Sequence, residues 1–300
     1  MMAVNAHSLA VAVPPGYMPP ASAMAQLRIG GEEHKELFCR EFITTHHAYE
    51  VRELAWPDLD ESSLGRLRAL PFWGEAVSSE HTAAAQVQAM ADAETDPLLR
   101  EAVTLQAYEE ARHAKLLVAL TSRYGIAVPA PSAYRRADPE WGFMRMGYGE
   151  CFDSFFAFGL FRLASTTGFF PPALVKIFDG VMQEEARHIL FFTNWAAHRG
   201  RHLPARLRPR FIARRVMGLA LQALGRVRTA LQLRDADAGD DFTMQVPDEI
   251  GDFSLRTLAE TCLAENDRRL SPYDGRLLRP RVVPRMVRAA VRFMPAKPGA

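Results

Sequence analysis

A five-residue string whose side chains can bind metal occurs twice in this chain. The two copies, Glu109–His113 and Glu184–His188, both read Glu-Glu-Ala-Arg-His. Each contains Glu-x-x-His, which places a carboxylate and an imidazole one turn apart on the same face of a helix. Two side chains placed in this way can bind one ion, and two such helices that face each other can bind two. The strings therefore predict four metal ligands: Glu110, His113, Glu185 and His188.

A site for two ions in a helical bundle also needs a carboxylate from each of two further helices. Glu80 and Glu150 lie in the helical segments that precede the two strings. Small and apolar residues share the helix face of Glu80, whereas the face around Glu150 is more mixed and includes Asp153, an alternative ligand. A bare charge is costly to bury, so glutamates on such faces must be protonated, paired or bound to metal. Four carboxylates match the charge of two divalent cations.

The elements that would position these residues are helices. Strand-like alternation is scarce, and helical periodicity dominates residues 71–200. Asp96-Pro97 is a helix-start signal and Gly125 a stop signal. The connections are short, long and short, which predicts an all-α fold: a four-helix bundle whose long middle connection crosses over along the bundle. The predicted helices span about 71–93, 97–124, 141–164 and 172–198, with Gly200 as the end of the last.

Segments on both sides of this core are predicted to be extensions of it. Residues 1–29 contain several prolines and are expected to form a flexible tail. Residues 30–70 form a helical N-terminal extension, with helices expected at about 32–54 and 62–70. Residues 201–300 form an Arg-rich helical C-terminal extension.

At this point the chain resembles the ferritin-like di-iron carboxylate superfamily, over residues 71–200 only. The form of its strings is closest to that of the soluble acyl-carrier-protein desaturases, in which an acidic residue precedes the ligand Glu and an Arg precedes the His. The resemblance implies two iron ions, with Mn/Fe or Mn/Mn pairs as alternatives because these ions accept the same ligands. The implied ligands are Glu80, Glu110, His113, Glu150, Glu185 and His188.

The resemblance also gives roles to the other residues of the strings. Family members often carry Asp before the ligand Glu, where it accepts a hydrogen bond from a metal-bound His. Here Glu109 and Glu184 hold that place, and their longer side chains depart from the pattern. Arg112 and Arg187 are expected to pair with these carboxylates across the bundle. His46 and His47 lie outside the bundle helices and are predicted to be surface or packing residues.

The function implied by the resemblance is that of an O2-dependent oxidase or oxygenase acting on a small organic molecule. No catalytic residue is predicted beyond the metal ligands. Electrons would come from a separate reductase or from the substrate. The alternative is a ferritin-like protein without an organic substrate, which handles iron as a ferroxidase or consumes peroxide.

Composition restricts the remaining classes of function. The chain has 300 residues, 48% hydrophobic, and a net charge of +1. Its three cysteines form no CxxC pair, which argues against a rubredoxin-type site, a zinc knuckle or a disulfide framework and favours the cytoplasm. The Arg-rich region is interpreted as a solvated face, with docking of an acidic carrier protein or reductase, or of an anionic membrane surface, as alternatives. Nucleic acid is not expected as a partner, and a homodimer is left open.

Overall fold

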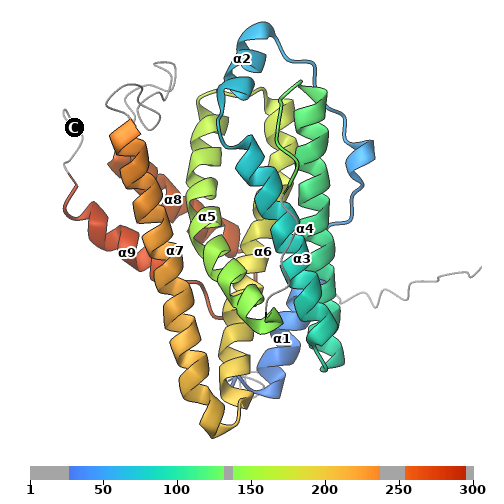
Figure 1. Ribbon diagram of the computed structural model, residues 1–300, viewed down its shortest axis with the longest axis vertical. Coiled ribbons are helices and arrows are strands. Elements are labelled where there is room, and N and C mark those ends of the chain that lie inside the picture. Colours follow the sequence, from blue (N-terminus) through green and yellow to red (C-terminus); the bar gives the residue numbers. More distant parts are fainter. Residues whose placement is uncertain (1–26, 132–137, 237–253, 295–300) are drawn as a thin grey trace, which may run out of the picture.

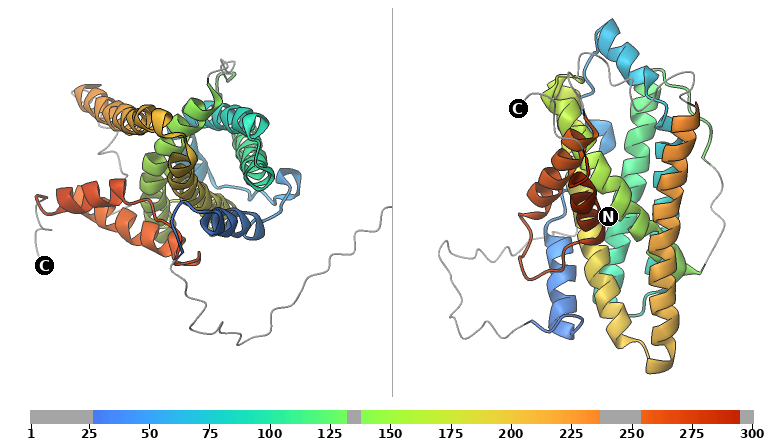
Figure 2. Two further views of the ribbon diagram at one scale, coloured as in Figure 1. Left: turned by 90° about the horizontal axis from the view of Figure 1, so that it is seen from below. Right: turned by 90° about the vertical axis from the view of Figure 1, so that its left-hand side faces the viewer.

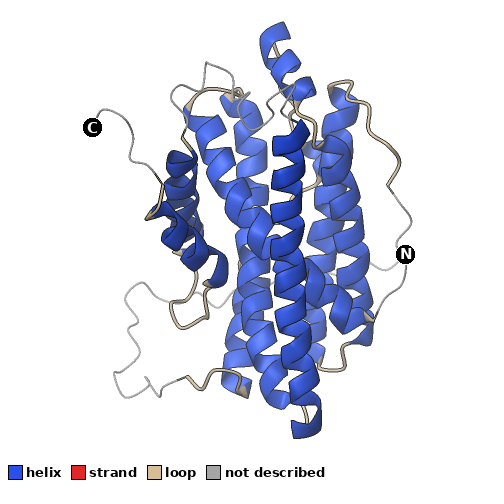
Figure 3. Ribbon diagram, turned by 60° about the vertical axis from the view of Figure 1, so that its left-hand side comes forward, coloured by secondary structure: helices blue, strands red, loops and turns tan. Residues whose placement is uncertain are grey.

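The computed structural model describes residues 27–131, 138–236 and 254–294, and side chains are described up to residue 226 in the middle range. Every regular element in these ranges is a helix (Figures 1 and 3). This confirms the all-α prediction for the described residues. The predicted tail falls almost wholly outside them. The core consists of four helices lying side by side: α3 (Trp73–Ala93), α4 (Pro97–Arg123), α5 (Pro139–Thr166) and α6 (Pro172–His202).

The ends of the core helices follow the local signals in the sequence. Asp96 is the N-cap of α4, and its carboxylate accepts hydrogen bonds from the backbone N–H groups of Leu98 and Leu99. Gly125 follows the last turn of α4 with a φ of +64°, a left-handed conformation that favours glycine. Asp138 caps α5 in the same way as Asp96 caps α4. These boundaries match the predicted ones within a few residues.

The helix predicted over about 32–54 is much shorter in the structure. α1 (Glu32–Thr44) ends ten residues early, and only a 3-10 turn, η2 (Val51–Glu53), follows. In between, the backbone carbonyls of His47 and Tyr49 accept hydrogen bonds from Arg112 of α4, at 3.0 and 3.4 Å. In a continuous helix these carbonyls would accept hydrogen bonds from backbone N–H groups of the same helix. The chain therefore leaves the helix where α4 presents a buried guanidinium.

Two further boundaries differ from the prediction. Gly200 does not end α6, which runs on to His202. A Cβ at Gly200 would lie 3.0 Å from the Phe211 ring, so this glycine serves the close approach of the next long helix rather than a helix stop. Pro71 precedes the first turn of α3 instead of lying within it, because the helix begins at Trp73.

The extensions pack on two sides of the core. α1 lies against α4 and α6, and α2 (Glu61–Ala69) covers one end of the bundle. α7 (Arg208–Ala236), which follows the turn η3 (Ala205–Leu207), and α8 (Leu255–Leu270) both pack on α5, and α9 (Val282–Val291) packs on α8. Seen along the bundle, the C-terminal helices lie outside α5, while α1 lies beside α6 (Figure 2). Within the described ranges, no helix has the length and apolarity needed to cross a membrane.

Replacing a glycine by alanine should have opposite effects on stability at two positions in the core helices. A Cβ at Gly159 of α5 would lie 2.9 Å from the backbone nitrogen of Cys262 in α8, whereas nothing lies within 4 Å of a Cβ at Gly180 in α6. Gly159→Ala should destabilise the protein by about 1–3 kcal/mol through overpacking. Gly180→Ala should stabilise it by about 0.5–1 kcal/mol, because alanine loses less backbone entropy in a helix. Urea denaturation of both variants measures the difference, and equal shifts would contradict the packing of α5 on α8.

Candidate metal centre

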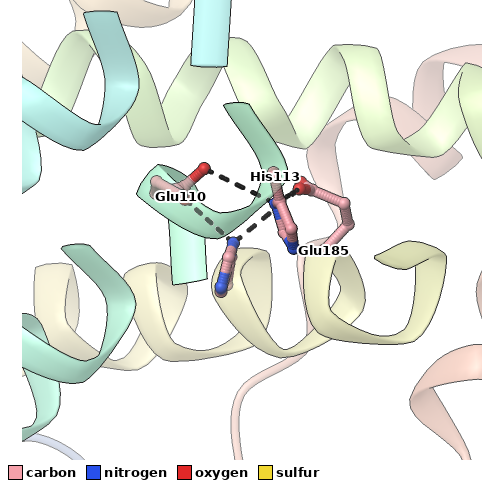
Figure 4. A group of neighbouring side chains, drawn as sticks. Glu110, His113 and Glu185 are labelled. Atoms are coloured by element: carbon pink, nitrogen blue, oxygen red, sulfur yellow. Dashed lines mark ion pairs between the residues drawn. The ribbon is translucent and has the colours of Figure 1, made fainter. Parts of the chain in front are cut away.

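The two strings face each other at the centre of the core. Glu110 and His113 come from α4, and Glu185 and His188 come from α6. One ligand atom from each of the four lies within 4.8 Å of the others. The two imidazoles and Glu110 are almost fully buried, and the side chain of Glu185 is only 11% exposed. Glu110, His113 and Glu185 point toward one another in Figure 4.

Both imidazoles direct the same ring nitrogen into this group. His113 Nδ1 lies 3.1 Å from Glu185 Oε1, and His188 Nδ1 lies 2.9 Å from Glu110 Oε1. Each Nδ1 is thus closest to the carboxylate of the opposite helix. Neither Nδ1 has a partner with hydrogen-bond geometry among the described residues.

The other ring nitrogens make reciprocal hydrogen bonds between the two helices. His113 Nε2 lies 2.7 Å from Glu184 of α6, and His188 Nε2 lies 2.9 Å from Glu109 of α4. A carboxylate can only accept, so each Nε2 carries the hydrogen. In a neutral ring this leaves the Nδ1 lone pair directed at the central group, which is the tautomer that a metal ion needs.

Two buried arginines complete this reciprocal arrangement. Arg112 Nη2 donates to Glu184 at 2.5 Å, and Arg187 Nη1 donates to Glu109 at 3.1 Å. All four side chains are at most 3% exposed. They are therefore not surface ion pairs, and they pair across the bundle in the way that the sequence analysis expected.

Glu80 and Glu150 lie beside the central group. Glu80 Oε2 is 3.8 Å from His113 Nδ1. Oε2 of Glu80 and both carboxylate oxygens of Glu150 are buried without a hydrogen-bond partner among the described residues. Asp153, the alternative to Glu150, instead turns to the exposed surface and accepts a hydrogen bond from Arg226 at 3.0 Å.

Burial makes the outer carboxylates of the group harder to ionise. Burial raises the pKa of Glu80 to about 7, against a smaller opposing effect of His113. Burial, followed by the negative charge of Glu110, holds the pKa of Glu150 well above its usual range.

Burial alone would lower the pKa of the two imidazoles, but the neighbouring glutamates outweigh this effect. The hydrogen bond to Glu184 raises the pKa of His113, and the charge of Glu110 raises that of His188. Burial also opposes ionisation of Glu110, yet His188 lowers its pKa to about 2. The protein without metal thus needs protons to balance its central charges.

Three residues that the sequence analysis did not assign to the site contact it. His46, predicted as a surface or packing residue, places Nδ1 2.5 Å from Glu109 Oε1. Ser154 donates to Glu185 at 3.1 Å, and Gln106 Nε2 donates to Glu110 at 3.4 Å. Gln106 lies four residues before Glu110, and Ser154 lies four residues after Glu150. This spacing places each of them on the same helix face as a predicted ligand, so the sequence held a signal for both. No local signal marks His46.

The donor atoms fit a metal centre. Unpartnered buried atoms are rare because each costs free energy, and among the described residues five of the side chains that carry one lie around this point: Glu80, Gln106, His113, Glu150 and His188. Imidazole nitrogens mixed with carboxylate oxygens suit iron, manganese and zinc better than calcium or magnesium, which prefer oxygen alone. The buried Glu/His cluster can therefore hold a metal ion.

No protein-family model, curated protein or solved structure matches this chain. The fold and the site together define its class: an all-helical protein, over the described residues, with a buried cluster of glutamates and histidines that can hold metal.

Adjacent histidines provide a test of the outer hydrogen bonds. His46→Ala removes the contact to Glu109 and should weaken metal binding by about tenfold, in the range seen when outer partners of metal-bound histidines are lost. His47→Ala should leave the affinity unchanged, because Arg112 contacts the backbone carbonyl of His47 and its side chain is exposed. Competition with a metal-binding dye measures both affinities. Equal affinities in the two variants would exclude a role for His46.

The central charges also predict how the stability of the metal-free protein depends on pH. Glu80 and Glu150 have raised pKa values, so the folded state loses stability as they ionise with rising pH. His113 and His188 also have raised values, and their stabilising contribution is lost as pH rises above their unfolded pKa of about 6.5. The melting temperature of the metal-free protein should therefore fall from about pH 5.5 to 9.

Bound divalent ions would replace those protons, so the metal-loaded protein should show a smaller fall and a higher melting temperature throughout. Differential scanning calorimetry at several pH values compares the two forms. Superimposable curves would show that the cluster does not bind the added metal.

Proposed function

We propose that this chain is a non-haem di-iron protein with a ferritin-like core, which acts as an O2-dependent oxidase or oxygenase on a small organic substrate. The observation that carries the proposal is the central cluster: two imidazoles and the carboxylates of Glu110 and Glu185 converge there, and buried oxygens of Glu80 and Glu150 without a partner among the described residues lie beside them. Two divalent iron ions would neutralise the four carboxylates. When bound, they would supply the electrons that activate O2.

The positions of the carboxylates favour two ions over one. Glu110 lies between the two imidazoles, with Oε1 2.9 Å from His188 Nδ1 and Oε2 3.9 Å from His113 Nδ1. Glu185 Oε1 likewise lies 3.1 Å from His113 Nδ1 and 3.9 Å from His188 Nδ1. Each of these two glutamates is thus near both imidazoles, where it could bind two ions at once. Glu80 would complete the ion at His113, and Glu150 would complete the ion at His188.

The connections between the core helices support a ferritin-like arrangement. The links before α4 and before α6 are short, whereas residues 124–138 form the long link between α4 and α5. A long middle connection is what a crossover along the bundle requires. The ligand candidates also come from all four core helices, with one Glu from each of α3 and α5 and a Glu-x-x-His from each of α4 and α6.

Small molecules would approach the ions from the side of α3. The side chain of Glu80 is 23% exposed, whereas those of Glu110, His113 and His188 are at most 2% exposed. Glu80 therefore marks the side on which the cluster lies nearest to solvent, although its own Oε2 is buried. On the opposite side, the Arg–Glu pairs and α1 close the centre to solvent.

The extensions favour an organic substrate over iron handling alone. α1, α2 and α7–α9 add helical layers to the core that an iron-storage subunit does not need. We propose that electrons come from a separate reductase or from the substrate, in the cytoplasm. Exposed arginines at the start of α7 and just before it would suit an acidic reductase or carrier protein: Arg206, Arg208 and Arg210.

Anaerobic loading with Fe(II), followed by metal analysis, tests the proposal. We expect about two irons per chain in the natural protein. Glu110→Ala should lose at least one of them, because this carboxylate faces both imidazoles. Asp153→Ala is the matched control and should keep the full content, since its carboxylate pairs with Arg226 on the surface. Full iron retention in Glu110→Ala would refute the ligand assignment.

The reaction is tested on the loaded protein by oxygen consumption in the presence of small organic substrates. Substrate-dependent O2 uptake that is lost in Glu110→Ala would support the oxidase or oxygenase. A large spherical assembly on size exclusion, with iron oxidation independent of any organic molecule, would instead identify a ferroxidase. Rapid loss of added hydrogen peroxide without O2 uptake would identify a peroxide-consuming protein.

A further inference from the structure

A second group of metal-binding side chains lies at one end of the bundle, away from the two strings. Glu32 begins α1, and His198 and His202 lie one turn apart in the last turns of α6. One ring nitrogen from each histidine and one Glu32 oxygen lie within 4.8 Å of one another. The start of α1 and the end of α6 meet near the lower end of the molecule in Figure 1.

The hydrogen bonds of His202 fix which of its nitrogens is free. Nδ1 lies 3.1 Å from the backbone carbonyl of His198, which can only accept, so Nδ1 carries a hydrogen. In the neutral ring, Nε2 then carries the lone pair, and this atom lies 3.3 Å from Glu32 Oε1. Two acceptors face each other at that distance, an arrangement that a bound cation would stabilise. Metal-binding imidazoles are commonly oriented in this way, because the ring N–H that does not face the metal donates a hydrogen bond to a carboxylate, a backbone carbonyl or water.

Glu32 is held in place by its other oxygen. Lys35 Nζ lies 2.6 Å from Glu32 Oε2 and also 2.5 Å from Asp96 at the start of α4. Asp96 offsets the charge of Lys35, so the ammonium group orients Glu32 without leaving a net positive charge beside the group. Oε1 remains directed at His202.

His198 supplies the third donor. Its side chain is 6% exposed, and its Nδ1 is buried without a hydrogen-bond partner among the described residues. The rings of His198 and His202 lie 4.1 Å apart between centroids.

We propose that Glu32, His198 and His202 bind a single divalent cation of the zinc type. Two imidazoles and one carboxylate are three of the four ligands of a tetrahedral zinc ion, and water would complete the set because the side chains of Glu32 and His202 are exposed. Calcium and magnesium are disfavoured by the nitrogen donors. This site does not depend on the proposed function of the central cluster.

The ion would link the first turn of α1 to the end of α6, because its ligands come from both helices. That contact matters for the centre of the protein, because α1 carries Phe42, whose backbone carbonyl accepts a hydrogen bond from Arg187 at 3.0 Å. The chain after α1 carries His46, which contacts Glu109. A cation at the helix ends would therefore hold in place the segment that covers one of the two buried ion pairs.

Titration of the iron-loaded protein with Zn²⁺ tests the site. Calorimetry should show one zinc bound per chain while the iron content stays constant. His202→Gln should weaken this binding by more than about tenfold, since even the loss of an outer partner has that effect. Glu32→Gln should do the same. His47→Ala removes an exposed histidine elsewhere and should bind zinc as the natural protein does.

Anomalous diffraction at the zinc edge would locate the ion and separate the outcomes. A peak between α1 and α6 that is absent in His202→Gln would establish the site. Zinc that binds only in the centre or elsewhere, or that binds equally to His202→Gln, would overturn the proposal. No zinc uptake would also overturn it. The melting temperature should rise with zinc in the natural protein and not in His202→Gln.

Discussion

The burial of charge at the centre of four helices constrains the rest of this structure. A carboxylate or guanidinium taken from water into a protein interior costs several kcal/mol, and only excellent geometry repays that cost. This protein buries four glutamates, two histidines and two arginines around one point, and buried carboxylate oxygens of Glu80 and Glu150 lie beside them. Glu109 and Glu184 each receive a guanidinium and an imidazole N–H. Glu110 and Glu185 face the two Nδ1 atoms, and Glu80 and Glu150 add two more carboxylates beside them. Divalent ions would balance the negative charge of these four groups.

The reciprocal contacts explain why one five-residue string suffices for both halves of the centre. Within each string, Glu110 and His113, or Glu185 and His188, face the centre, while the residues before them face the opposite helix. The orienting carboxylate of each imidazole therefore comes from the other helix. A change in the spacing or rotation of α4 against α6 would break both sets of contacts together. The geometry of the ligands is thus tied to the packing of the two helices.

Much of this arrangement follows from local patterns. The Asp96 cap, the repeated string and the glutamates of the two other helices could be identified from local residue types and spacing. The pairing of Arg112 and Arg187 across the bundle was expected once the resemblance had placed the two strings on facing helices. The early end of α1 could not. Residues 45–54 contain no proline or glycine that would stop a helix, and the stop arises from Arg112, which is distant in sequence. The continuation of α6 through Gly200 likewise depends on a tertiary contact, that with Phe211. Local signals specify elements, whereas contacts between elements decide where some of them end.

α1 shows why the centre cannot be understood as a four-helix unit alone. Its last turn places the Phe42 ring against the Arg187 guanidinium, 4.5 Å from the centroid, and its carbonyl takes one of the N–H groups. The residues that follow place Tyr49 against Arg112 in the same way, at 3.8 Å. Each buried arginine thus has an aromatic face and a backbone carbonyl from the N-terminal extension in addition to its glutamate. Without this extension both guanidinium groups would meet water, which would weaken their pairing with Glu109 and Glu184 and loosen the imidazoles that those carboxylates orient. In the structure, the N-terminal extension therefore covers the two buried ion pairs that orient the ligands of the candidate metal centre.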